Sequence, residues 1–179
     1  AFTDRDVDID TVKSIIQIAK QSPSGVNTQP WNVYVLSGDA RDKLVNEATS
    51  RYDQGKMDGQ EYLVYPKEMP DWYKERRRAV GWAMYGAIGI EKGDTEKMMA
   101  QGRKNYEFFG APVGIFITVK NCVGPNGWGH VGHFIQNVCL LDLRLRTSRI
   151  RVQNEYFLFR FPSSNPNDNR LKHVSAIKD

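Results

Sequence analysis

Hydrophobic positions in the first third of the chain recur first at helical and then at strand spacing. The helical positions are Val12, Ile15, Ile16 and Ala19. Their spacing of three or four predicts an amphipathic helix over 11–21, with Asp10 as its cap. Residues 32–36 (NVYVL) alternate apolar and polar side chains, as a half-buried strand does. A second helix is predicted over 39–51, with Asp39 as its cap.

The middle of the chain alternates an irregular segment, helices and one apolar strand. Residues 52–70 mix Gly, Pro, Met and Tyr without a period, which favours a loop or a lid over a ligand. Helices are predicted over 71–90 and from Asp94 or Thr95 to about 105. The run VGIFITV at 113–119 is continuously apolar and rich in β-branched residues. It predicts a central strand that is buried on both faces.

The last part of the chain contains one more strong helix pattern. Residues 124–130 (GPNGWGH) predict a turn, and 128–142 carry apolar residues around most of a helix. That helix is expected to be deeply buried or to lie at a subunit interface. Residues 155–161 (EYFLFRF) read as a strand before an irregular tail. The order of elements predicts an α+β fold, with helices flanking a central mixed sheet in a single domain over 1–179.

Composition narrows the class of protein without identifying it. Lys and Arg total 25 and Asp and Glu total 21, a formal net charge of +4 that favours no particular partner. Cys122 and Cys139 have no metal-type spacing, which is typical of a reduced, cytoplasmic protein. Apolar runs such as 113–119 are far shorter than the roughly 20 residues that cross a bilayer. We therefore expect a cytoplasmic protein without a membrane partner.

Basic runs and a histidine pair offer competing readings. The run KERRR at 74–78 can bind phosphate or nucleic acid, or form the solvated face of its helix. The run RLRTSRIR at 144–151 is a nucleic-acid candidate, although no interleaved aromatic motif surrounds it. His130 and His133 are three apart, so they can hold a metal or make polar contacts at a helix surface or dimer interface. No P-loop, GxSxG, HExxH or GxGxxG motif occurs.

The connection SPSGVNTQPW at 22–31 concentrates residues that suit a binding loop. Pro23 and Pro30 restrict the backbone around a set of hydroxyl, amide and open backbone donors. Fixed donors and acceptors beside Trp31 suit a flat heteroaromatic ring. The alternative is a turn that ends the helix, in which Asn27 and Gln29 make local hydrogen bonds.

Residues 19–38 (AKQSPSGVNTQPWNVYVLSG) closely resemble the P-S-G/S-x-N-x-Q-P-W signature of the FMN-dependent nitroreductase family. Three later blocks, 77–94, 103–119 and 132–141, resemble one branch of that family in the same order. The resemblance implies a nitroreductase-like fold that forms a homodimer, with FMN at the interface between the chains. The family's Arg-Arg-Ser element before "AF" is not in this sequence, and 142–179 is a divergent or truncated counterpart of the family's end.

The resemblance also implies which residues hold the cofactor. Gln29 is expected to support the loop rather than touch the flavin. Arg103 can stabilise negative charge on the reduced flavin, or it can be an ordinary solvated arginine at a helix end. The implied cofactor-binding residues are Pro23, Ser24, Gly25, Asn27, Gln29, Arg103 and, for the phosphate, Arg170. No catalytic side chain and no metal are implied, because the flavin carries the chemistry.

The activity that the resemblance implies is reduction of a small aromatic substrate. NAD(P)H would reduce FMN, and a nitroaromatic, a quinone or a related electron-poor compound would then be reduced in a ping-pong mechanism. Residues 52–70 and the aromatic side chains of 105–109 are candidates for selecting that substrate. Two alternatives remain open: a flavin-binding homologue without turnover, and a basic nucleic-acid-binding module.

Overall fold

The computed structural model describes residues 7–56, 63, 65–144, 150–153 and 175–176. The predicted strand at 155–161 lies outside these residues. The helices are α1 (Ile9–Ala19), α2 (Gly38–Asp53), α3 (Asp71–Ala87), α4 (Thr95–Arg103) and α5 (Pro125–Arg144). The strands are β1 (Trp31–Ser37), β2 (Val113–Val119), β3 (Ile150–Gln153) and β4 (Ser175–Ala176). Short 3₁₀ turns are η1 (Gly25–Asn27), η2 (Phe108–Gly110) and η3 (Asn121–Val123).

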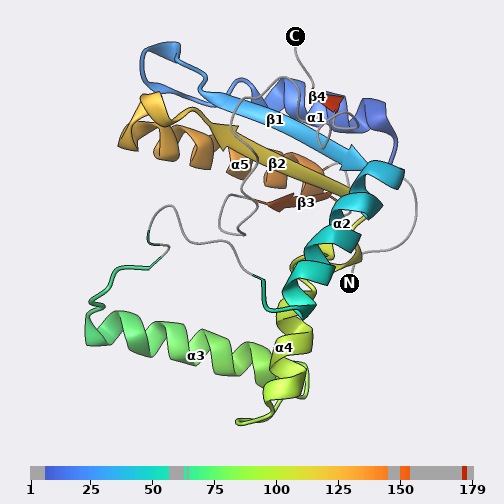
Figure 1. The fold of residues 1–179 in the computed structure, drawn as a ribbon. Coiled ribbons are helices and arrows are strands. Elements are labelled where there is room, and N and C mark those ends of the chain that lie inside the picture. Colours follow the sequence, from blue (N-terminus) through green and yellow to red (C-terminus); the bar gives the residue numbers. More distant parts are fainter. Residues whose placement is uncertain (1–6, 57–62, 64, 145–149, 154–174, 177–179) are drawn as a thin grey trace.

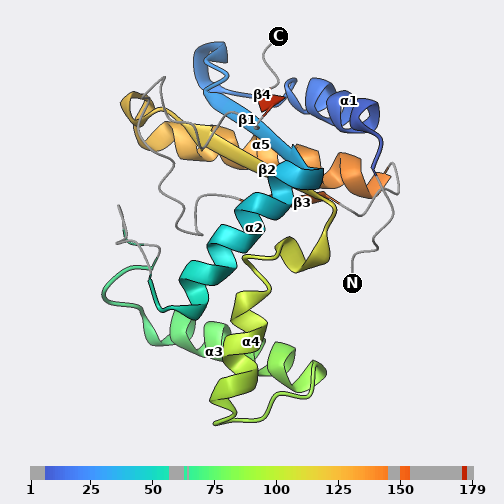
Figure 2. The same cartoon turned by 45° about the vertical axis from the view of Figure 1, so that its right-hand side comes forward.

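The described strands form the mixed central sheet that the sequence predicts, in the order β3-β2-β1-β4. β1 pairs antiparallel with β2, from Trp31 opposite Val119 to Ser37 opposite Val113. β2 pairs with β3 in parallel, and β1 pairs with β4 antiparallel. Figures 1 and 2 show α5 lying behind the β1–β2 pair.

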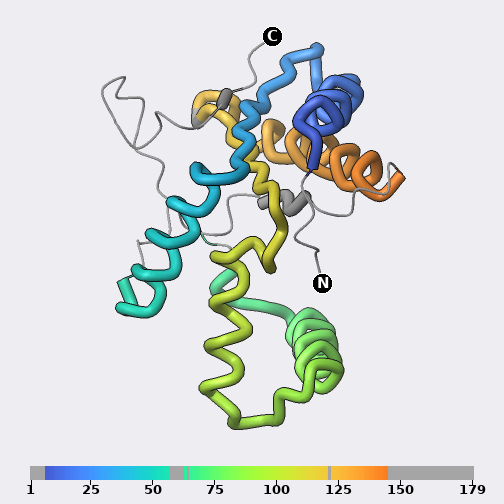
Figure 3. Tube along the Cα trace, turned by 90° about the vertical axis from the view of Figure 1, so that its right-hand side faces the viewer, coloured from blue at the N-terminus to red at the C-terminus, as the bar shows by residue number. Residues whose placement is uncertain are grey.

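One face of the sheet carries the main hydrophobic core, beneath α1 and α5. Figure 3 shows these two helices side by side on the same side of the strands. Alternate strand residues point toward them, and Val33 is paired with Ile117, as Val35 is with Ile115. The buried members of this cluster are Val12, Ile15, Ile16, Ala19, Val33, Val35, Val113, Ile115, Ile117, Phe134 and Val138. The period-two and helical patterns in the sequence therefore identified this core correctly.

The opposite face carries a smaller cluster under α2 and η2. Leu36 and Phe116 point to this side and pack with Phe108 and Ala111. Leu44 and Val45 of α2 cover the cluster from above. β2 is consequently buried on both faces along residues 113–117, as its unbroken apolar run predicts.

α3 and α4 project away from the sheet. Figure 1 shows both helices at the end of α2 that is remote from β1, and Figure 3 shows them below α1, α5 and the strands. None of the described residues of α3 is buried. Large apolar side chains are nevertheless exposed along it, among them Trp72, Val80, Trp82 and Met84. A helix of this kind lacks the tertiary cover that normally stabilises an amphipathic helix.

Three helix starts differ from the sequence prediction. The cap of α1 is Asp8, whose side chain accepts from the Asp10 N–H, so Asp10 lies in the first turn instead. Asp39 likewise lies in the first turn of α2, whose N-cap position is Ser37. α5 starts at Pro125, because proline suits the first turn of a helix, where no N–H is needed. The cap at Asp94 is confirmed, since its carboxylate accepts from the Lys97 N–H.

The described helices can be compared with what a membrane crossing requires. No helix within these residues combines the length and the apolar character that a bilayer crossing needs.

Candidate functional site

The loop between α1 and β1 has an unusual backbone. Figure 1 shows it at the left end of β1, beside the first turns of α5. Val26, Asn27 and Gln29 have φ values of 47°, 55° and 42°, in the left-handed region that residues other than glycine seldom adopt. Val26 is β-branched and 97% exposed, so no packing of its own side chain explains its conformation. Backbone held in this way is typical of a functional loop.

Hydrogen bonds within the loop fix this conformation. The Gln29 N–H donates to Ser24 Oγ at 3.0 Å, which closes the loop across five residues. The Gln29 side-chain Nε2 donates to Asn27 Oδ1 at 2.9 Å. This bond orients the Asn27 amide and leaves its Nδ2 group as a donor that a ligand oxygen can use. Gln29 therefore acts on the loop through Asn27, which agrees with the supporting role expected from the sequence.

One face of α5 anchors the loop to the core. The Gly25 N–H donates to His130 Nε2 at 3.0 Å, and His133 Nδ1 lies 3.2 Å from the Pro23 carbonyl oxygen. One turn further, Asn137 Nδ2 donates to Ser22 Oγ at 2.6 Å. Residues 130, 133 and 137 share a helix face because they are three and four apart. Sequence reasoning found the loop but missed this anchor, for which the histidine spacing was the available signal.

His130 and His133 thus serve the loop backbone. His130 Nε2 accepts the hydrogen bond from the Gly25 N–H, and His130 Nδ1 is buried without a partner among the described atoms. Gly25 lies tight against the same ring: a Cβ there would be 3.2 Å from His130 Cε1. The polar-contact reading of the two histidines is the one that these distances favour.

Arg103 occupies a different part of the molecule. At the end of α4 its guanidinium pairs with both oxygens of Asp53, at 2.9 and 3.1 Å, and also contacts Glu107. The hydrogen bond from Arg103 holds the pKa of Asp53 below its ordinary value, and Asp53 in turn raises the pKa of Arg103. Within one chain, the cluster of Arg103 and Asp53 lies beyond the end of β1 that leads into α2. The loop between α1 and β1 lies at the opposite end of β1. The structure does not bring Arg103 to the loop, and its flavin role stays a prediction.

The remaining candidates are only partly within the described residues. Arg170 lies outside them, as does much of 52–70. Phe108 is buried in the smaller cluster, so it is not available to a ligand. Tyr106 stands 4.9 Å from Tyr52, ring centre to ring centre, and burial raises the pKa of Tyr106. Tyr106 and Phe109 remain the candidates for substrate contact from 105–109.

The loop carries polar groups that suit a flat heteroaromatic ligand. Residues 25–29 are exposed, and they present backbone groups and an oriented amide at a surface that the anchor on α5 holds in place. A flat ring with carbonyl and imide groups fits such a set of fixed donors and acceptors. The loop forms only one wall, so a ligand there needs a second surface to cover its other side.

Comparison with known proteins identifies relatives along most of this chain. A model described as the nitroreductase family matches residues 1–144. The chain is 34% identical over 151 residues to a 4-nitrobenzoate reductase from Nocardioides sp. (strain LMS-CY), which covers 82% of this chain and 60% of that protein. It is 32% identical over 141 residues to a nitrobenzene nitroreductase from Ectopseudomonas oleovorans, with 78% and 62% covered.

Solved structures agree with this result. The FMN- and NADPH-dependent nitroreductase NfnB from Sphigopyxis sp. strain HMH superposes with a TM-score of 0.76 at 36% identity, covering 81% of this chain and 66% of that one. The FMN-dependent NfnB from Mycobacterium smegmatis, in complex with NADPH, gives 0.76 at 26% identity, with 81% and 65% covered. The chain spans about 60% of the length of the curated relatives that it matches. On the family match, the relatives and the shared α+β architecture, the chain belongs to the nitroreductase family.

Proposed function

We propose that this chain works as an FMN-dependent oxidoreductase that uses NAD(P)H to reduce nitroaromatic, quinone or related electron-poor compounds. The observation that carries the proposal is the loop at 22–29, which is exposed over 25–29, with its left-handed backbone and its anchor on α5. Membership of the nitroreductase family supports the choice of ligand. Relatives described as FMN- and NADPH-dependent, or as reductases of nitrobenzoate and nitrobenzene, support the choice of reaction.

The residues of the loop divide the work of binding. Ser24 and Asn27 present polar groups to the flavin ring, and Pro23 limits the freedom of the backbone before them. Gly25 contributes an open backbone without a side chain, because its N–H is bonded to His130 and its carbonyl to the Thr28 N–H. Gln29 keeps the Asn27 amide in one orientation through the bond from Nε2 to Oδ1. FMN, once bound, would supply the redox chemistry: it can accept a hydride from NAD(P)H and pass the electrons to the second substrate. The protein's own task is to hold the ring, orient it and leave one face open to a small aromatic compound.

A second copy of the chain is the proposed cover for the loop. The exposed apolar side chains of α3 and of the α5 end, such as Val80 at 67% and Leu143 at 66%, support an interface between copies. For α5 the sequence left deep burial or a subunit interface open, and its exposed side chains support the proposal of an interface. Sedimentation measured over a range of protein concentrations checks the proposed homodimer.

Flavin titration of loop variants tests the proposal. The protein is titrated with FMN, and binding is followed by the change in flavin fluorescence. Asn27→Ala removes the oriented amide, and Ser24→Ala removes the acceptor that closes the loop. Each is expected to weaken FMN binding about tenfold, which corresponds to the loss of one well-placed hydrogen bond in a ligand site.

Gln21→Ala is the matched control, because it removes an exposed amide just before the loop. It should leave the affinity for FMN unchanged. The proposal fails if the protein takes up no FMN, or if the two loop variants bind FMN as tightly as the control does. Binding without NAD(P)H oxidation would instead identify a flavin-binding homologue without turnover.

A further inference from the structure

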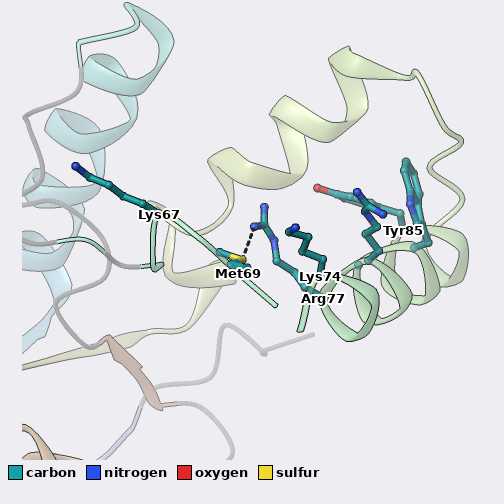
Figure 4. A pocket seen from close by; sticks show the side chains of 8 residues that line it. Lys67, Met69, Lys74, Arg77 and Tyr85 are labelled. Atoms are coloured by element: carbon teal, nitrogen blue, oxygen red, sulfur yellow. Dashed lines mark hydrogen bonds between the residues drawn. The ribbon is translucent and has the colours of Figure 1, made fainter. Parts of the chain in front are cut away.

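A second site lies on α3, away from the flavin loop. It is a pocket of about 490 Å³ between the helix and the segment that precedes it. Figure 4 shows Arg77 reaching from α3 toward Met69 on that segment, with Lys74 beside it. The lining residues are Lys67, Met69, Lys74, Arg77, Arg78, Gly81, Trp82 and Tyr85. The volume is in the range of pockets that bind small molecules.

The lining is positively charged. Four of these described residues are Lys or Arg and none is acidic. Asp71 partly offsets one of them, because its Oδ1 lies 3.1 Å from Lys74 Nζ. Arg77 is held in place by its contact with Met69 Sδ at 3.8 Å and by the Tyr65 ring, 5.0 Å from its guanidinium carbon. A positioned guanidinium beside a second one, Arg78, suits a doubly charged phosphate monoester.

The far end of the pocket is aromatic and open. Trp82 and Tyr85 line it, with ring centres 5.9 Å apart and planes inclined by 58°, so the exposed Trp82 ring offers a face on which a flat base can stack. Gly81 lies between the cationic and aromatic residues on the same helix face, and a Cβ added there would meet no atom within 4 Å. The glycine therefore leaves the floor of the pocket free. The solvated face that the sequence predicts for 74–78 is confirmed as exposed, but it also forms one wall of this pocket.

The ligand that matches both ends carries a phosphate monoester next to a purine. We propose that the pocket binds the adenosine 2′-phosphate end of NADPH and so selects NADPH over NADH. This inference rests on the proposed function, which makes NAD(P)H the reductant. Relatives described as NADPH-dependent agree with it. The guanidinium groups of Arg77 and Arg78 bind the 2′-phosphate, and the exposed Trp82 ring stacks on the adenine, beside Tyr85.

The opposite side of α3 remains available for contact between copies. At about 100° per residue, Trp72 and Val80 lie about 80° apart on one side of the helix, most of the pocket residues of α3 lie on the other side, and Met84 lies beside Arg77 at the boundary. Packing through the apolar side would leave the pocket open. For the nicotinamide end of an NADPH bound here to reach the flavin, α3 of one copy has to lie beside the loop at 22–29 of the other copy.

Binding of nucleotide fragments to the whole protein tests the pocket without involving the flavin. The probes are adenosine 2′,5′-bisphosphate, adenosine 5′-monophosphate and pyrophosphate, measured by calorimetry and by quenching of tryptophan fluorescence. The bisphosphate is expected to bind about tenfold more tightly than the monophosphate, because only it places a phosphate monoester at the 2′ position. Pyrophosphate should bind without the quenching that stacking on Trp82 produces.

Variants of α3, each with a matched control outside the pocket, test whether the pocket residues themselves bind the nucleotide. Arg77→Gln together with Arg78→Gln should weaken the bisphosphate about tenfold or more. Arg76→Gln is the control, because its guanidinium lies over Trp72, 5.2 Å from the ring centre, and does not line the pocket. Gly81→Leu fills the floor without changing charge, and Gly86→Leu is its control outside the pocket. Helix propensity favours both leucines, so these two proteins should fold.

Kinetics of the flavin-loaded protein link the pocket to the reaction. The double arginine variant should raise KM for NADPH about tenfold and leave KM for NADH unchanged. The inference is overturned if the two mononucleotides bind equally, if Arg76→Gln weakens binding as much as the double variant, or if a single-stranded oligonucleotide binds more tightly than the bisphosphate. Failure to bind FMN with intact binding of the bisphosphate would refute the proposed function and leave the nucleotide site standing.

Discussion

Phe108 and Gly114 fit together because the glycine has no side chain. A Cβ at position 114 would lie 2.6 Å from a carbon of the Phe108 ring, closer than real contacts allow. The ring uses this space to pack edge-on against Phe116, with ring centres 5.6 Å apart. The smaller cluster under α2 therefore depends on one missing methyl group in the central strand.

Gly114→Ala is expected to destabilise the protein by about 1 to 3 kcal/mol, because the added methyl group overpacks a tight site. Urea unfolding followed by circular dichroism measures the effect. Gly132→Ala is the control, since a Cβ there meets no atom within 4 Å and alanine favours the α5 helix. Adding Phe108→Leu to Gly114→Ala should make the two losses less than additive, and additive losses would contradict the proposed clash.

At the scale of elements, one cluster of charges attaches α4 to α2. Arg103 at the end of α4 binds the Asp53 carboxylate at the end of α2. The hydrogen bond keeps the folded-state pKa of Asp53 below 3.8, its ordinary value. A lowered carboxyl pKa means that the attachment contributes at pH values above the ordinary pKa and is lost as the pH falls through the folded-state pKa.

Hydrogen exchange of α4 amides, corrected for the intrinsic effect of pH, is therefore expected to stay constant from about pH 7 to 5 and to rise below about pH 4. Asp53→Asn should accelerate this exchange already at neutral pH. Asp42→Asn, which removes a carboxylate elsewhere on α2, should not. Wild-type exchange in Asp53→Asn at neutral pH would show that the charge pair does not hold the two helices together.

Most elements of the fold could be predicted from the sequence because their patterns reflect burial. β1 and β2 follow directly from alternation and from an unbroken apolar run, and α1 follows from its helical stripe. The start of α5 could not be predicted, because Gly124 and Pro125 are typical of a turn and also of the beginning of a helix. Local signals of this kind leave a choice that only tertiary packing decides.

The sequence was enough to predict which segment forms the candidate site, but not the conformation of that segment. The residues of 22–31 stand out by type, but the left-handed conformation of Val26 runs against its own preference. It is held by partners more than 100 positions away, as in the bond between Gly25 and His130. The pocket on α3 was missed for the same reason, since it needs residues 65–70 to fold back beside the helix.

At the scale of the whole molecule, the core and the projecting helices have different roles. α1, α5 and the sheet bury the core and hold the loop at 22–29, whereas α3 and α4 extend outward and α3 carries exposed aromatic side chains. Figure 2 shows this division between the sheet at the top and the helices below. The proposed homodimer would stabilise such a chain, because a second copy could cover both the exposed side of α3 and the loop at 22–29.

The proposed flavin-dependent activity is tested most directly by the colour of the reconstituted protein under anaerobic conditions. The whole chain is loaded with FMN, freed of excess flavin, and mixed with NADPH while its visible absorbance is recorded. On the proposed function, we expect the flavin bands to bleach when NADPH is added and to return when a nitroaromatic compound is added. Protein that emerges colourless after loading, or flavin bands that NADPH does not bleach, would contradict it.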